Sequence, residues 1–138
     1  MKLQIILNDQ DKISNYNHVV CTGEPLDLSN VCDNECEEIL ANNILDMYTL
    51  EQIGQVVQQL VTKLRIGGEI AIGGTECRVF AKSIVNGIIS ESQASDIISQ
   101  KKSMTNISIV KKALQQLGLS ILSTSIEGIS YEIKAKRG

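Results

Sequence analysis

The stretch TLEQIGQVVQQLVTKLRIGGEIAIGG (residues 49–74) predicts an amphipathic helix followed by a buried strand. Apolar residues recur in its first part at intervals of three and four, which places them on one helical face: Leu50, Ile53, Val57, Leu60, Val61 and Leu64. Thr49 followed by Gln52 fits a capping box at the start of this helix. We therefore expect a helix over 49–64.

Gly67 and Gly68 follow this helix, and we expect them to end it with a left-handed cap. EIAIGG (69–74) is mostly apolar, which is typical of a fully buried strand. Its final two glycines could approach a phosphate, but no Lys-Ser/Thr follows as in a phosphate loop. Three shorter runs precede the helix and predict further strands: KLQIIL (2–7), NHVVC (17–21) and EEILANNIL (37–45).

Residues 78–117 have helical character but are broken into several pieces. The signals that mark the breaks are, in order, Asn86-Gly87, a second capping box at Ser90 and Gln93, and Gly118. The polar segment ESQASDIISQKKS (91–103) is either a loose surface helix or a flap that binds a partner.

Two β-like runs, 119–126 and 129–136, close the chain with Glu127-Gly128 between them, the pattern of a hairpin. The order of elements is thus strand, strand, strand, helix, strand, helices, hairpin. Such alternation predicts an α/β fold with a mostly parallel sheet, to which the C-terminal hairpin adds antiparallel strands. The 138 residues make room for a single domain, 1–138.

Composition excludes several classes of protein. The chain has 13 basic and 16 acidic residues and a net charge of −3, which argues against a protein held to nucleic acid by phosphate contacts. No apolar run approaches the roughly 20 residues that span a bilayer, and the start MKLQIILNDQD turns polar too early for a signal peptide. We expect a soluble, cytoplasmic protein that binds neither nucleic acid nor membrane.

The cysteines leave two interpretations open. Cys32 and Cys36 are close enough to share a metal ion, but zinc ribbons need two such pairs, and Cys21 and Cys77 are isolated. The other interpretation is four half-buried thiols in a reducing compartment. Acidic neighbours in CDNECEE (32–38) raise thiol pKa values, which makes reactive thiolates less favourable. We predict no metal site.

From ILANNILDM (39–47) onwards, the chain resembles a class I S-adenosylmethionine-dependent methyltransferase. The family's Leu-Lys-Pro-Gly-Gly segment before its fifth strand is matched by LRIGG (64–68), with isoleucine for proline. VKKALQQLGLSIL (110–122) resembles the last helix, turn glycine and sixth strand, and ISYEIKAK (129–136) resembles the seventh strand. The resemblance covers about residues 37–136 and implies a Rossmann-like methyltransferase fold. A final strand inserted antiparallel between two parallel strands would agree with it, whereas a final strand at the sheet edge would favour an unrelated α/β binding module.

The first part of the chain departs from this family. A methyltransferase grips its cofactor with a glycine-rich turn after the first strand. Here that strand is followed by NDQDK (8–12), and the first glycine of the chain is Gly23. Nine residues separate Leu7 from Asn17, fewer than the dozen or so that a crossover helix takes. We therefore expect a truncated N-terminal part, with the first helix missing or reduced to a turn.

Four residues are candidates for cofactor binding if the resemblance extends to function. The backbone of Asn8 and Asp9 would replace the glycine turn, and Glu24 or Asp27 would hold the nucleoside of S-adenosylmethionine. Asp27 stands where the family often places an aspartate that accepts from the adenine amino group. An aspartate in a turn also commonly caps its own loop, so this alternative stays open.

Asn42 and Asn43 are the candidate catalytic residues. They stand at the mouth of the strand that forms the catalytic edge in this family, where open α/β sheets bind ligands. They are also consistent with a strand that simply ends in polar residues. Asp46 and Met47 replace the glutamate and histidine of the family's Leu-Glu-His segment, and methionine cannot accept a proton. Methyl transfer depends on positioning more than on acid–base groups, so activity is not excluded.

Two functions remain open. An intact scaffold with a degenerate cofactor motif favours a methyltransferase-like domain that has lost cofactor binding and acts as a structural or protein-interaction subunit, with a protein partner or self-association. Its small size resembles shrunken copies in bacteriophage genomes, which implies a viral origin and a location in the host cytoplasm or virion. The alternative is an active minimal methyltransferase that uses S-adenosylmethionine on an unknown acceptor.

Overall fold

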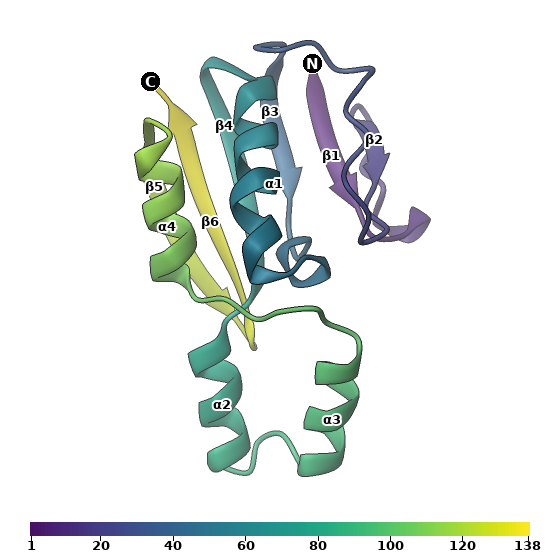
Figure 1. Cartoon of the computed structure of the whole chain (residues 1–138), viewed down its shortest axis with the longest axis vertical. Coiled ribbons are helices and arrows are strands. Elements are labelled where there is room, and N and C mark those ends of the chain that lie inside the picture. The colour runs from purple at the N-terminus through teal and green to yellow at the C-terminus, as the bar shows by residue number, and fades with distance from the viewer.

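The computed structural model describes residues 1–9 and 11–138 in full and Gln10 by its backbone alone. Figure 1 shows the whole chain. Its elements are, in order, β1 (Lys2–Ile6), the 3₁₀ turn η1 (Asp9–Asp11), β2 (Asn17–Val20), β3 (Cys36–Ala41), the 3₁₀ turn η2 (Leu45–Met47), α1 (Leu50–Lys63), β4 (Leu64–Thr75), α2 (Cys77–Val85), α3 (Glu91–Ser99), α4 (Ile107–Gln116), β5 (Leu119–Glu127) and β6 (Ser130–Arg137).

The strands form one six-stranded sheet in the order β2-β1-β3-β4-β6-β5. The first four strands pair in parallel, and β6 pairs antiparallel with β4 on one side and with β5 on the other. The final strand is therefore inserted between two strands of the opposite direction, not placed at the sheet edge. This confirms the predicted mixed sheet and the arrangement that the resemblance implied.

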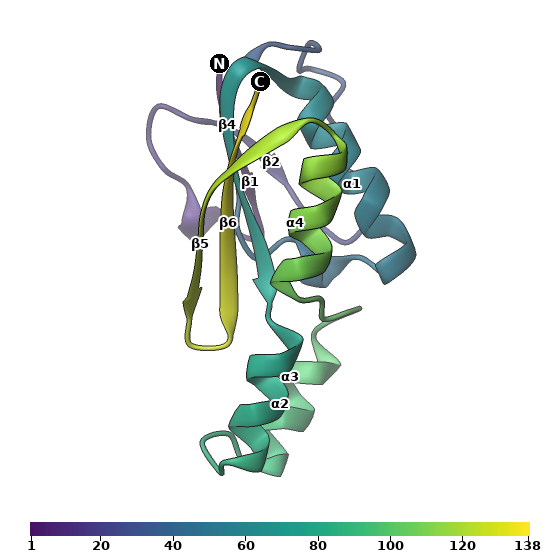
Figure 2. The ribbon, with the colours of Figure 1, turned by 90° about the vertical axis from the view of Figure 1, so that its left-hand side faces the viewer.

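Helices α1 and α4 cover one face of the sheet (Figures 1 and 2). The predicted apolar face of α1 is buried from Ile53 onwards, whereas Leu50 in the first turn is 62% exposed. The core between helices and sheet contains fully buried side chains from both layers, among them Val57, Leu60, Val110, Leu114, Ile39, Ile72 and Ile133. Burial of this layer is the main source of stability.

The opposite face of the sheet is polar at its centre. Lys2, Glu38 and Glu69 occupy paired positions on β1, β3 and β4, and they alternate with core residues, so their side chains lie on the face away from the helices. Lys2 Nζ lies 3.8 Å from Glu38 Oε2. Parallel sheets are ordinarily covered by helices on both faces. Here, within the described residues, the segment between β1 and β2 lies on this face (Figure 2). Charged side chains occupy the centre of the face.

The predicted helix over 49–64 is confirmed, with Thr49 and Leu64 as its cap residues, but the predicted cap at Gly67 and Gly68 is wrong. Helix α1 ends at Lys63, and β4 begins at the next residue. Gly67 does have a positive φ of 81°, but it lies inside β4, where the pairing register with β3 shifts. A Cβ on Gly68 would lie 2.9 Å from the carbonyl oxygen of Cys36. The two glycines therefore permit an irregular, close strand pairing instead of a helix cap.

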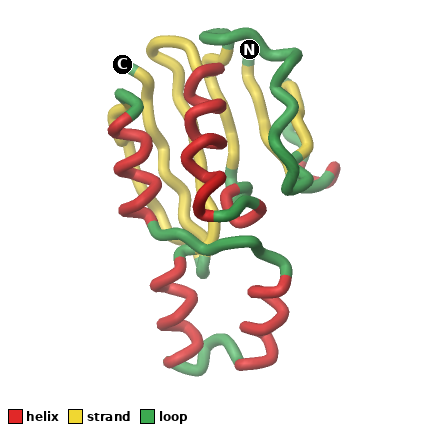
Figure 3. The backbone as a smooth tube through the Cα atoms, in the orientation of Figure 1, coloured by secondary structure: helices red, strands yellow, loops and turns green.

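The three predicted helical pieces are confirmed as α2, α3 and α4. Both capping boxes have the expected contacts: Gln52 Oε1 accepts from the Thr49 N–H at 3.0 Å, and Ser90 Oγ accepts from the Gln93 N–H at 3.2 Å. Helices α2 and α3 project together beyond the carboxyl ends of the parallel strands (Figure 3). Among the described residues, no helix is both long enough and apolar enough to cross a bilayer.

Candidate cofactor site at the carboxyl edge of the sheet

Asn42 and Asn43 form the turn that ends β3. The predicted strand 37–45 stops at Ala41, and Asn43 has a left-handed φ of 64°, which asparagine tolerates better than most residues. Both asparagines line two cavities at this edge, one of about 230 Å³ beside the crossover from β1 and one of about 210 Å³ beside the β5–β6 hairpin. The candidate catalytic residues therefore lie where open α/β sheets bind ligands.

The crossover between β1 and β2 is tied down against the sheet. Gln4, buried within β1, donates from Nε2 to the Asp11 carbonyl at 2.7 Å and accepts from the Ile13 N–H at Oε1 at 2.9 Å. Within the described chain, the only helical turn of this crossover is η1, as the short spacing predicted. Leu7, Asp11 and Ile13 consequently form one wall of the 230 Å³ cavity.

Asn8 and Asp9, the candidates for replacing the glycine turn, are not part of that wall. Among the described residues, the lining of the cavity takes Leu7 and Asp11 from this segment. The Asp9 side chain is 83% exposed and pairs with Lys12 at 3.4 Å. The crossover thus presents Leu7, Asp11 and Ile13, rather than its predicted cofactor residues, to the space beside Asn42.

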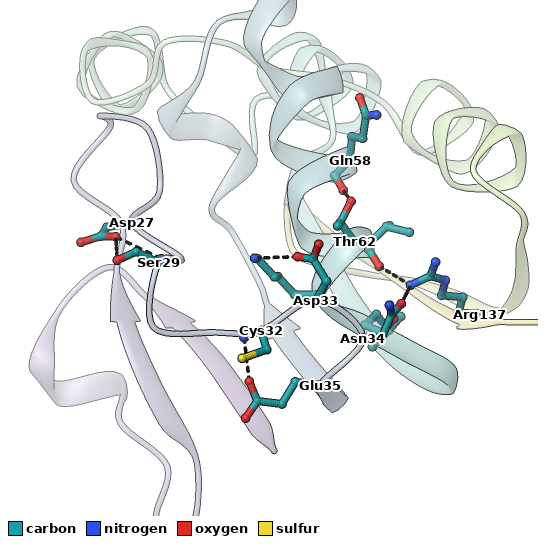
Figure 4. A network of polar contacts seen from close by, with 12 residues as sticks. Asp27, Ser29, Cys32, Asp33, Asn34, Glu35, Gln58, Thr62 and Arg137 are labelled. Atoms are coloured by element: carbon teal, nitrogen blue, oxygen red, sulfur yellow. Dashed lines mark hydrogen bonds and ion pairs between the residues drawn. The ribbon is translucent and has the colours of Figure 1, made fainter.

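Asp27 caps its own turn. Its Oδ1 accepts from the Ser29 N–H at 3.1 Å and from the Ser29 hydroxyl at 2.6 Å (Figure 4), and these two bonds lower the pKa of its carboxyl group. It lines a groove of about 640 Å³ between its loop and α1, where Gln55 and Gln58 form part of the opposite wall. This is the arrangement expected of a turn aspartate.

Glu24 also lies away from the asparagines. Its side chain is exposed, and its backbone carbonyl accepts from the Tyr48 hydroxyl at 3.1 Å. The fold therefore brings Asn42 and Asn43 together but does not gather Glu24, Asp27 and the start of the crossover around either of the two cavities that the asparagines line.

A buried carboxylate that the sequence did not reveal lies next to this edge. Asp46 accepts from the Thr75 N–H at 2.8 Å and from the Thr75 hydroxyl at 2.7 Å, and its Oδ2 lies 2.8 Å from Lys101 Nζ. A Cβ on Gly74 would lie 2.8 Å from Asp46 Oδ1. The space beside Gly74 is thus taken by this carboxylate and not by a phosphate.

Glu76 joins the first turns of two helices. Its Oε1 accepts from the Arg78 N–H of α2 at 3.0 Å, and its Oε2 accepts from the Ile107 N–H of α4 at 2.9 Å. A carboxylate is favourable at a helix N-terminus, because the unpaired N–H groups there carry partial positive charge. Its place one residue before a helix is the sequence signal that could have identified it.

Tyr131 completes the group of polar contacts at the base of the projecting helices. Its hydroxyl lies 2.6 Å from Thr105 Oγ1. Burial, with smaller contributions from the negative charges of Asp46 and Glu76, raises the pKa of Tyr131 to about 12. These contacts anchor α2 and α3 to the sheet.

The chain matches no protein-family model and is significantly similar to no curated protein. Solved structures are similar in fold. A methyltransferase dependent on S-adenosylmethionine (SAM) from Archaeoglobus fulgidus is 14% identical, with a TM-score of 0.63, over 96% of this chain and 74% of that one. The 1,6-didemethyltoxoflavin-N1-methyltransferase of Burkholderia thailandensis, solved with bound 1,6-didemethyltoxoflavin and S-adenosylhomocysteine, is 14% identical, with a TM-score of 0.59, over 99% of this chain and 61% of that one. This chain has a class I methyltransferase-like fold. At such identities, the similarity establishes the fold alone.

Within this methyltransferase-like fold, the carboxyl edge is where a ligand is expected. The two cavities lined by Asn42 and Asn43 measure about 230 and 210 Å³. Small-molecule sites usually measure roughly 300–1,000 Å³. Each of these two cavities is therefore smaller than an ordinary small-molecule site. Gln4 holds the β1–β2 crossover, which forms one wall of the cavity of about 230 Å³.

Proposed function

We propose that this methyltransferase-like domain does not bind S-adenosylmethionine and acts as a structural or protein-interaction subunit. The observation that carries the proposal is a pair of hydrogen bonds at Gln4, which donates to the Asp11 carbonyl and accepts from the Ile13 N–H. They hold the crossover against the edge at which the cofactor would bind. The cavity between this crossover and Asn42, about 230 Å³, is below the usual size of a small-molecule site.

The polar face of the sheet supports a domain that is stable without a second helical layer. Lys2, Glu38 and Glu69 stand at positions that a covering helix would bury, and a buried charge is costly unless it is paired. In a domain whose sheet is covered by helices on both faces, this face would be apolar. Charged residues there indicate adaptation to water.

The projecting helices support the interaction role. Val85 is 84% exposed at the end of α2, Ile88 is 74% exposed in the following turn, and Ile98 is 53% exposed on α3. Val85 and Ile88 are close in sequence, and neighbouring exposed apolar side chains can mark interaction sites on soluble proteins. A bacteriophage origin remains a prediction from the size of the chain.

The alternative function is a minimal S-adenosylmethionine-dependent methyltransferase. It is favoured by the position of Asn42 and Asn43 between two cavities and by the left-handed backbone of Asn43, since unusual backbone conformations cluster at functional sites. In this case the crossover would have to release its contacts with Gln4 before the cofactor entered.

Calorimetric titration of the full chain with S-adenosylmethionine and S-adenosylhomocysteine tests the two functions. We expect no binding heat and no rise in melting temperature with ligand up to about 1 mM. Such a result would exclude a dissociation constant below about 1 mM. Micromolar binding would overturn the proposal. Binding at this edge would then be weakened by Asn42→Ala and left unchanged by Asp33→Ala, a control whose carboxylate pairs with Lys63 at the other end of α1.

A further inference from the structure

Strand β5 is an unusually open edge of the sheet. Among the described residues, it pairs with β6 alone, and Figure 2 looks onto its outer side. Leu119–Ile126 contains no charged side chain. Leu122 and Ile126 are each 49% exposed. An edge strand of this kind presents unpaired N–H and C=O groups to another strand.

Natural edge strands are usually protected by charges, prolines, bulges or shortness. In β5 the protection is one irregularity, a register shift between Ile121 and Ser123. Beyond it, the strand pairs regularly with β6 as far as Glu127. The opposite edge, β2, is protected better, because it has four residues and the His18 ring contacts the Ile13 carbonyl of the crossover at 3.0 Å.

We propose that β5 pairs antiparallel with β5 of a second copy of this chain, about a two-fold axis at Thr124. In this register, Thr124 faces its own equivalent and Ser123 faces Ser125. Leu122, which stands at the register shift of β5, lies opposite Ile126 in this register. Opposite residues in an antiparallel pair lie on the same face, and the regularly paired residues 123–125 satisfy that condition.

The charge pattern favours a second copy over a different partner. A charged edge would repel its own equivalent, whereas in this register the five uncharged residues 122–126 meet the same five residues of the second copy without like charges. Glu127 lies opposite the uncharged Ile121. Edge pairing alone buries less than the roughly 1,200 Å² of a standard interface, so we expect a weak dimer with a dissociation constant in the micromolar range.

This inference rests on one part of the proposed function, the protein-interaction role. It does not rest on the loss of S-adenosylmethionine binding, because β5 can pair whether or not the carboxyl edge binds a cofactor. A chain that binds S-adenosylmethionine could still dimerise, and a monomeric chain could still lack the cofactor. The titration with S-adenosylmethionine therefore tests the proposed function, and the sedimentation experiment tests the pairing of β5, each independently of the other.

Sedimentation equilibrium of the full chain over a range of concentrations tests the pairing. We expect a monomer–dimer equilibrium, and Thr124→Lys or Thr124→Glu alone should weaken it about tenfold or more, because each places like charges opposite each other. An equimolar mixture of the two variants should restore the dimer. The control Val20→Lys, at an exposed position of the other edge, should leave dimerisation unchanged.

Three results would overturn the inference. They are a wild-type chain that stays monomeric at its solubility limit, a dimer that Val20→Lys disrupts while both Thr124 variants do not, and a mixture of Thr124 variants that fails to re-associate. Melting temperatures of each variant establish that loss of the dimer is not loss of the fold. Thr124→Ser replaces either variant if it does not fold, and with it the wild-type affinity should be retained.

Discussion

Lys101 Nζ lies 2.8 Å from Asp46 Oδ2, and the two residues are 55 positions apart in the chain. The Asp46 side chain is 7% exposed and that of Lys101 is 22% exposed, so the pair is largely removed from water. It connects the segment after α3 to the turn after β3. Together with the bond from the Lys102 N–H to the Asp46 carbonyl, at 2.8 Å, it holds the projecting helices on the sheet.

Asp46→Asn should destabilise the fold by about 2–3 kcal/mol, because it leaves the partly buried ammonium of Lys101 without its counter-charge. Urea unfolding measures the loss. The matched control is Asp33→Asn, which breaks an ion pair of the same 2.8 Å length whose carboxylate is 61% exposed. Exposed pairs contribute little, so the control should cost less than about 1 kcal/mol. Equal losses in the two variants would contradict the role given to Asp46.

Gly74→Ala should destabilise the fold by about 1–3 kcal/mol, because the added methyl group would overlap the Asp46 carboxylate and force it from Thr75. The control is Gly54→Ala on α1, where a Cβ would meet nothing within 4 Å. There the change should stabilise by about 0.5–1 kcal/mol through better helix propensity. Thermal unfolding of the two variants should therefore shift in opposite directions.

Stability should fall between about pH 10 and pH 12. The folded state holds the pKa of Tyr131 at about 12, above the ordinary tyrosine value of 10.0, so over this interval the native state binds more protons than the unfolded state. Stability that is complete below pH 10 is consequently lost as the pH rises. Tyr131→Phe should flatten this decline, as measured by urea midpoints at several pH values. An unchanged slope would show that Tyr131 is not the group responsible.

Two cysteines should react with a thiol reagent in the native protein and two should not. Cys32 and Cys77 are exposed, whereas Cys21 and Cys36 are buried, and burial raises the pKa of the Cys36 thiol. Quantitative labelling before and after denaturation checks this. Fast modification of Cys36 in the native state would contradict the packing of β3 described above.

Local signals predicted most of the elements. The Thr49–Gln52 and Ser90–Gln93 pairs mark helix starts within four residues, because capping bonds join residues adjacent in sequence. The glycine at 128 marks the final turn for the same reason. The resemblance to methyltransferases added the position of the final strand inside the sheet, which local patterns do not contain.

The candidate site could be predicted only in part. Asn42 and Asn43 were found because the end of a strand fixes which edge they occupy. Asp27 was placed in a cofactor role by analogy, and its position was instead determined by Ser29, two residues away. The resemblance singled out the position of Asp46, but its buried contacts could not be predicted, because its partners lie at 75 and 101.

The amino-acid sequence by itself determined the helices, the strands, their caps and the shortness of the first crossover, since each depends on residues close together in the chain. Tertiary structure alone decided that Gly67 lies at a strand irregularity, that Gln4 holds the β1–β2 crossover and that charged side chains occupy one sheet face. These features depend on which distant segments become neighbours, and backbone pairing and burial select those neighbours only when the whole sheet has formed.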